Sequence, residues 1–126
     1  MKTVELKVGG RKLRLAFTLG ALCEMQDTLS DFDMARLSEY VKTPKTMLDV
    51  MAILAKHGEA LEGRTLDVDR EWLGLHLSPA PNRVAAVQIA LLNALAEGMR
   101  METEDDAETE VDEVLESIKK KETAGA

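Results

Sequence analysis

The first seventeen residues constrain the fold most, because their apolar positions alternate twice around a pair of glycines. Apolar side chains occupy every second position in residues 4–8 and again in residues 13–17, with Gly9-Gly10 between the two runs. Strict alternation is typical of strands with one buried face, and two glycines suit a two-residue hairpin turn with positive φ. Closing the turn there predicts a β-hairpin with the cross-strand pairs Val4–Leu15, Glu5–Arg14, Leu6–Leu13 and Lys7–Lys12.

Helical spacing of apolar residues replaces this alternation from Thr18 onward. Four side chains, those of Thr18, Asp33, Thr43 and Asp69, stand where an oxygen can cap the start of a helix. The hairpin is therefore expected to precede a compact bundle of four to five helices, which makes the fold class α+β. The expected helices cover residues 19–29, 34–41, 44–58, 70–77 and 82–99.

The pattern inside these segments gives more specific expectations. Gly58 is placed to end the third helix, and Cys23 is expected to be a small helix-packing residue. The helix over residues 82–99 is apolar inside except for Gln88 and Asn93, which predicts a central core helix with both faces covered. The alternative is that one of its faces is left for a partner. The first helix is expected to bury the stripe Leu19, Leu22, Met25 and Leu29.

The charge divides the chain into two parts. The whole protein carries a formal charge of −7, from 16 Lys and Arg against 23 Asp and Glu. Residues 101–126 hold ten of the acids and three lysines, so the full −7 lies in this tail, and residues 1–100 are neutral with 13 of each sign. We therefore expect a body over residues 1–100 and an acidic tail over residues 101–126, and no nucleic-acid partner.

The predicted hairpin is basic, although the body as a whole is neutral. Its sequence allows two interpretations: a solvated face whose charges discourage strand-to-strand aggregation, or a docking surface for an acidic segment. That segment could belong to a partner or to the protein's own tail. The charged residues concerned are Lys2, Lys7, Arg11, Lys12 and Arg14, with the single acid Glu5.

The tail itself has two different halves. Residues 102–110 contain no apolar side chain larger than alanine, so this stretch is expected to be solvated. After it, apolar residues return at the i, i+3, i+4 and i+7 spacing of a short amphipathic helix. Such a helix would form on contact with a partner or pack back on the body. The stripe consists of Val111, Val114, Leu115 and Ile118.

Several classes of protein are disfavoured by what the sequence lacks. Cys23 is the single cysteine, so no internal disulfide is expected. The longest uncharged stretch, residues 84–96, is too short for a membrane helix of ~20 residues. No phosphate-binding loop, zinc-helix spacing or nucleophile–base motif is visible. We therefore expect a cytoplasmic, non-enzymatic protein without a membrane partner, metal site or cofactor.

Seven methionines among few aromatic residues suggest an adaptable contact surface, since unbranched thioether side chains repack easily around partners. The alternative is that methionine fills an aliphatic core, because Met25 and Met51 also lie on expected core stripes. The candidate partner-binding residues are Met34, Met47, Met51, Met99 and Met101 in or next to the body, with Val111, Val114, Leu115 and Ile118 in the tail.

The segment from Val4 to Phe17, followed by Thr18-Leu-Gly-Ala-Leu-Cys-Glu-Met25, resembles the tail assembly chaperones of long-tailed bacteriophages and prophages. The small tail proteins of gene transfer agents begin similarly. The shared pattern is a basic hairpin, then Phe-Thr-x-Gly-Ala-Leu at the start of a helical body, and it covers roughly residues 1–100. The resemblance implies a non-enzymatic protein that binds the tape-measure protein and helps recruit tail-tube subunits.

The leading hypothesis is thus an assembly chaperone that binds an amphipathic helix through the apolar faces of residues 34–54 and 82–101. Two alternatives stay open: a structural tail or connector component of a phage-like particle, and a regulatory adaptor that acts through its acidic tail. Self-association is compatible with each of them.

Overall fold

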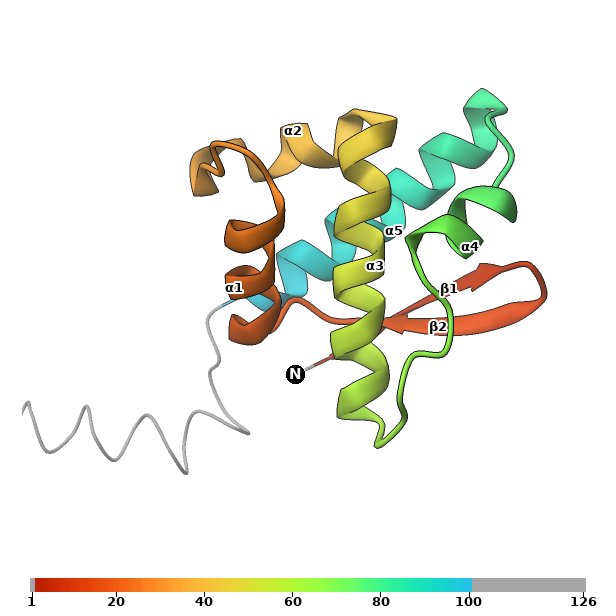
Figure 1. The fold of residues 1–126 in the computed structure, drawn as a ribbon, viewed down its shortest axis with the longest axis horizontal. Helices are drawn as coiled ribbons and strands as arrows, with labels where there is room; N and C mark the ends of the chain where they lie inside the picture. Colours follow the sequence, from red (N-terminus) through yellow and green to blue (C-terminus); the bar gives the residue numbers. More distant parts are fainter. Residues whose placement is uncertain (1, 101–126) are drawn as a thin grey trace, which may run out of the picture.

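The computed structural model describes residues 2–100, which form an α+β fold with an N-terminal hairpin followed by helices (Figure 1). This confirms the predicted fold class and the predicted order of elements. The acidic tail and its short helix lie outside the described residues. The elements are β1 (Val4–Val8), β2 (Arg11–Leu15), α1 (Leu19–Thr28), a 3₁₀ turn η1 (Met34–Arg36), α2 (Leu37–Lys42), α3 (Pro44–Leu61), α4 (Arg70–Leu75) and α5 (Pro81–Met99).

The hairpin has the predicted register in full, with Leu6 opposite Leu13 and Lys7 opposite Lys12. Gly9 and Gly10 have φ values of 54° and 79°, as the two-residue turn requires. One assignment is corrected: Arg11 pairs with Val8, so it belongs to the face turned toward the helices rather than to the basic outer face. Its guanidinium lies 5.6 Å from the ring centre of Trp72 in α4.

Helix α1 begins where it was predicted, because the Thr18 hydroxyl accepts a hydrogen bond from the Ala21 N–H at 3.0 Å. Met25 and Leu29 are buried and Leu22 is half-buried, but Leu19 is 77% exposed. The predicted stripe is therefore wrong at its first position, where the helix has only just left the hairpin. Cys23 is also exposed rather than packed between helices.

The predicted helix after Asp33 is divided into η1 and α2. Asp33 caps this segment as expected, through its side chain and the Ala35 N–H. The Tyr40 hydroxyl then accepts from the Asp33 N–H at 2.7 Å, while the Tyr40 ring stacks on Phe32. These contacts hold the segment before η1 against α2 and bury the Tyr40 side chain.

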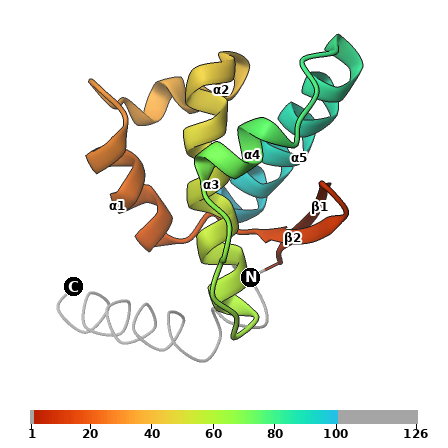
Figure 2. The same cartoon turned by 45° about the vertical axis from the view of Figure 1, so that its right-hand side comes forward.

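Helix α3, and not α5, is the central element of the body. It packs against β2 and against α1, α2, α4 and α5, whereas α5 contacts β1, α2 and α3 (Figures 1 and 2). The prediction that α5 is the central helix with both faces covered is therefore wrong. The alternative, in which one face of α5 is left open, agrees with the structure.

Gly58 does not end α3, which continues to Leu61. A Cβ atom at Gly58 would lie 2.0 Å from the Arg14 carbonyl oxygen of β2, so glycine is required by close packing of two backbones. Immediately beside it, the Ala16 N–H donates to the Leu54 carbonyl of α3 at 3.0 Å. On the opposite side, a Cβ atom at Gly98 of α5 would lie 2.3 Å from the Phe17 carbonyl oxygen. Two helical glycines thus allow α3 and α5 to pack closely against the end of β2 and the residues that follow it.

The core is aliphatic, as the small number of aromatic residues predicts. The largest fully buried side chains come from both strands and from each of the helices α1 to α5. Two of them are methionines. They are Leu15, Met25, Met51, Leu54, Leu73, Leu91, Val8, Val41, Val50 and Val87.

The Gly58→Ala variant should be less stable than the wild type by about 1–3 kcal/mol, because the new methyl group must push β2 away from α3. Urea unfolding measures the difference. Gly74→Ala is the matched control, since a Cβ atom there meets only Leu48 at an ordinary 3.5 Å and alanine favours the helix. Equal stability of Gly58→Ala and the wild type would contradict the close backbone contact.

Candidate functional site

The structure places the predicted contact residues of the body in two different environments. Met34 and Met99 lie on the surface, with exposed fractions of 36% and 55%. Met47 and Met51 are 4% and 0% exposed, so their assignment to a partner surface is corrected. Both lie on the inner side of α3, where the elements packed around this central helix cover them. Five further candidates, Met101, Val111, Val114, Leu115 and Ile118, lie outside the described residues.

The strongest candidate for a binding surface is one face of α5, which we call the α5 face. Its large apolar members are Ile89, Leu92 and Met99, with exposed fractions of 58%, 37% and 55%. They share this side of the helix with small or polar residues that are also exposed, at the i, i+3, i+4 and i+7 spacing of one face. These are Asn82, Ala85, Ala86, Asn93 and Ala96.

The α5 face is uncharged along its length from Asn82 to Met99. The two ionisable residues within the helix, Arg83 and Glu97, lie off this face and are half-buried. Arg83 donates to the Lys7 carbonyl of β1, and Glu97 pairs with Arg100. Several of the side chains around Ile89 are alanines, which project little from the helix. Small side chains at a contact allow two helices to approach closely. The face is therefore suited to a second apolar helix.

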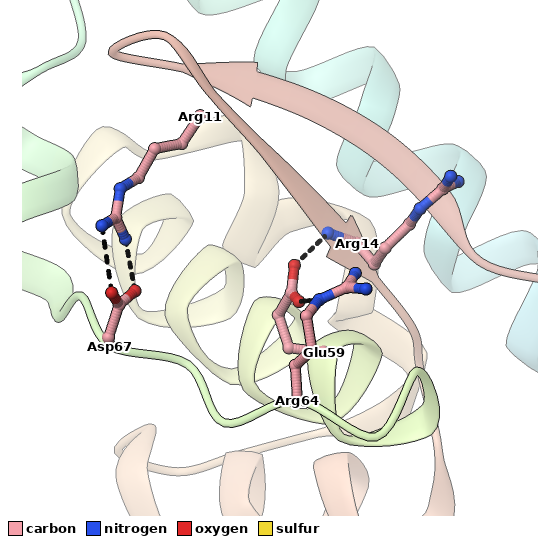
Figure 3. Close-up of polar contacts among 5 residues, drawn as sticks. All are labelled: Arg11, Arg14, Glu59, Arg64 and Asp67. Atoms are coloured by element: carbon pink, nitrogen blue, oxygen red, sulfur yellow. Dashed lines mark hydrogen bonds and ion pairs between the residues drawn. The ribbon is translucent and has the colours of Figure 1, made fainter.

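A polar cluster joins β2, α3 and the loop that follows α3 (Figure 3). Glu59 is 6% exposed and accepts two hydrogen bonds, from the Arg14 N–H at 3.0 Å and from the Arg64 guanidinium at 2.5 Å. Burial alone would raise the pKa of Glu59. The hydrogen bonds from Arg64 and Arg14 outweigh this effect, so the net pKa lies below its ordinary value. Glu59 is therefore a structural acceptor that ties the strand edge to α3.

A second ion pair in this region joins Arg11 to Asp67 (Figure 3). The two terminal guanidinium nitrogens of Arg11 each donate to one carboxylate oxygen of Asp67. The guanidinium of Arg11 lowers the pKa of Asp67. Between the two pairs, β2 and the loop border an open depression of about 340 Å³. Its two carboxylates, Glu59 and Asp67, are already engaged by arginines. This arrangement fastens the loop to the hairpin.

The structure also brings together a hydroxyl, an imidazole and a carboxylate that are far apart in the sequence. His57 Nδ1 lies 3.0 Å from the Thr18 hydroxyl, and His57 Nε2 lies 2.9 Å from Glu24. Because a carboxylate can only accept, the Nε2–H of His57 donates to Glu24.

The hydroxyl and the carboxylate of this arrangement also have structural roles. The hydroxyl serves as the cap of α1, and Glu24 also accepts from Lys56 at 2.8 Å. The ammonium of Lys56 makes the largest contribution to lowering the pKa of Glu24, with His57 contributing in the same direction against partial burial. The contacts attach α1 to α3, and Gly20 leaves room for the imidazole, since a Cβ atom there would lie 2.8 Å from the ring.

Within residues 2–100, no three His, Cys, Asp or Glu side chains gather in a way that could hold a metal ion. None of the described helices combines the length and the apolar character needed to cross a membrane.

Comparison of the chain with protein-family models, with curated proteins and with solved structures finds no match.

Sequence reasoning missed the polar contacts and part of the surface for different reasons. Glu59 and Arg14 are 45 positions apart, and Thr18 and His57 are 39 apart, so no local spacing reveals either contact. The α5 face did have a signal, because Ile89, Ala85 and Ala96 repeat at helical spacing without a charged residue among them. The same pattern is equally typical of a helix that is covered on all sides. Only the packing of the other elements decides whether this face of α5 is exposed or covered.

Glu59→Gln should lower the free energy of unfolding by about 1.5–3 kcal/mol at neutral pH, because two hydrogen bonds to a buried charged group are weakened. The pKa of Glu59 is depressed in the folded state, so its stabilising contribution is complete above the ordinary value of 4.5 and is lost as the pH falls below it. Urea unfolding between pH 7 and pH 3 should therefore show the variant and the wild type converging toward acid.

Asp67→Asn is the control for this prediction, since it removes an ion pair whose side chains are 44% and 66% exposed. Exposed pairs contribute little, so its stability should stay close to that of the wild type. A constant difference between Glu59→Gln and the wild type at all pH values would show that the carboxylate charge is not involved.

Proposed function

We propose that this protein is a non-enzymatic phage tail assembly chaperone that binds an amphipathic helical segment of the tape-measure protein on the α5 face. The observation that carries the proposal is the uncharged apolar surface around Ile89, Leu92 and Met99 on an otherwise neutral body. Recruitment of tail-tube subunits, and action in the host cytoplasm, belong to the same proposal and rest on the resemblance of residues 4–25 to that family.

The dimensions of the α5 face support a helix as its ligand. The 19 residues of α5 span about 28 Å at 1.5 Å per residue, which is about five turns. A helix laid along this length presents apolar residues every three or four positions, and the face presents Ala85, Ile89, Leu92, Ala96 and Met99 at the same spacing. A partner without charge on its buried stripe would leave no ionised group unsatisfied.

Met99 adds adaptability at the end of this face. Its thioether side chain is 55% exposed and unbranched, so it can fill gaps of different shape under successive segments of a long helix. A chaperone of a long repetitive helix has to bind many related stripes rather than one unique sequence. The α5 face meets this requirement better than a deep, rigid pocket would.

Co-expression with a fragment of the tape-measure protein encoded in the same phage or prophage genome should give a soluble complex. The double variant Ile89→Glu/Leu92→Glu should bind the fragment at least about tenfold more weakly, because central apolar residues carry most of the binding free energy. Isothermal titration with the purified fragment measures the dissociation constant.

Leu75→Glu provides the matched control, because Leu75 is 76% exposed but lies on α4, away from the α5 face. This variant should bind like the wild type. If the wild type neither forms a complex nor increases the solubility of the fragment, the proposal fails. If mass spectrometry finds the chain in finished particles at the abundance of a tail subunit, a structural role replaces the chaperone role.

A further inference from the structure

We propose that the outer face of the hairpin is the docking site for the acidic tail of the same chain, residues 102–116. The hairpin outer face consists of Glu5, Lys7, Lys12 and Arg14, which point away from the helices. It is independent of the α5 face, and so the inference does not rest on the proposed function.

Two lysines of this face stand directly opposite each other. Lys7 and Lys12 form a cross-strand pair, and both are exposed. Their position in the register, one removed from the turn-flanking pair Val8–Arg11, makes them a non-hydrogen-bonded pair, in which side chains approach most closely. Like charges at such a position destabilise a hairpin. A carboxylate bound between the two ammonium groups would remove this repulsion.

The described part of the chain supplies little negative charge to this face. Glu5 lies 3.9 Å from Lys12, and no acid among residues 2–100 lies within 4.0 Å of the charged groups of Lys7 or Arg14. Four other cations of the body differ, because each has a carboxylate partner. These pairs are Arg11–Asp67, Lys56–Glu24, Arg64–Glu59 and Arg70–Asp49. Carboxylates of the body thus pair with these four cations, whereas the outer face of the hairpin keeps a net positive charge.

Helix α5, which precedes the tail, ends near the hairpin. Gly98 packs against Phe17, two residues beyond the end of β2, so α5 ends at the base of the hairpin (Figure 1). From there, residues 101–110 can extend to about 33 Å. A five-residue strand is about 17 Å long. The acidic stretch is therefore long enough to follow the hairpin from its base to the Gly9-Gly10 turn.

The charges on the two segments are complementary. Nine of the ten tail acids lie within residues 102–116, and no basic residue interrupts them. Each exposed ion pair contributes little by itself, so the contact depends on several pairs at once. Because exposed charges are screened over ~8 Å at physiological ionic strength, the docked state should be sensitive to salt. Its release would open the hairpin face to an acidic partner.

A Glu-specific protease tests this contact in the full-length protein. In the Lys7→Glu/Lys12→Glu variant, cleavage after Glu104 should be about fivefold faster than in the wild type at low salt. This factor is expected when a few exposed ion pairs between the tail and the hairpin are lost together. Added salt should accelerate cleavage of the wild type and leave the variant unchanged. Lys42→Glu/Lys45→Glu is the control, because it makes the same change in charge on exposed residues at the junction of α2 and α3.

A second variant separates docking from the stability of the body. Lys7→Gln/Lys12→Gln removes the cross-strand repulsion, so thermal unfolding should show a body that is equally or more stable. Cleavage after Glu104 should nevertheless be faster than in the wild type. Slower or unchanged cleavage in either hairpin variant would overturn the proposal. Protection that increases with protein concentration would also overturn it, because the tail would then dock on a second copy.

Discussion

Helices α3 and α5 approach the end of β2 and the two residues after it at backbone distance, and these contacts join the sheet to the helices. Gly58 of α3 meets the Arg14 carbonyl on one side, and Gly98 of α5 meets the Phe17 carbonyl on the other. The Ala16 N–H then donates directly to the Leu54 carbonyl inside α3. A two-stranded hairpin is marginal alone in water, and here its inner face gains a core only because both helices approach this closely. The positions of α3 and α5 relative to the sheet follow from these contacts.

The same packing decides which surfaces stay open. Glu59 bonds the outer edge of β2 through the Arg14 N–H, and Arg83 bonds the edge of β1 through the Lys7 carbonyl. Both edges of the sheet are thus occupied by side chains, which protects them from pairing with another strand. Since α3 takes the central place, α5 is packed on one side only. Among the described residues, the outer face of the hairpin and the α5 face are two surfaces left open for partners.

Local sequence patterns predicted the elements well, because their signals lie within a few residues. Alternation and the Gly9-Gly10 turn determined the hairpin register, and Thr18, Asp33 and Asp69 cap helices as expected. Two errors are local: the helix expected over residues 34–41 is divided into η1 and α2, and the Thr43 side chain makes no capping hydrogen bond at the start of α3. The other errors concern contacts between distant segments. Gly58 has the residue type of a helix end but serves a close approach to β2, 44 positions away. Met47 lies on an apolar stripe that could face a partner or the core, and only the central place of α3 decides for the core.

The two open surfaces differ in the chemistry that can recognise them, and this separates their roles. The α5 face has no charge, so binding there depends on the removal of apolar surface from water and does not weaken as the ionic strength rises. The outer face of the hairpin has little apolar surface and three cations, so binding there weakens as the ionic strength rises. The neutral total charge of residues 1–100 hides this division, because other cations of the body are balanced by buried or half-buried acids such as Glu59 and Asp49. An apolar helix and an acidic segment could therefore occupy the body at the same time, each without displacing the other.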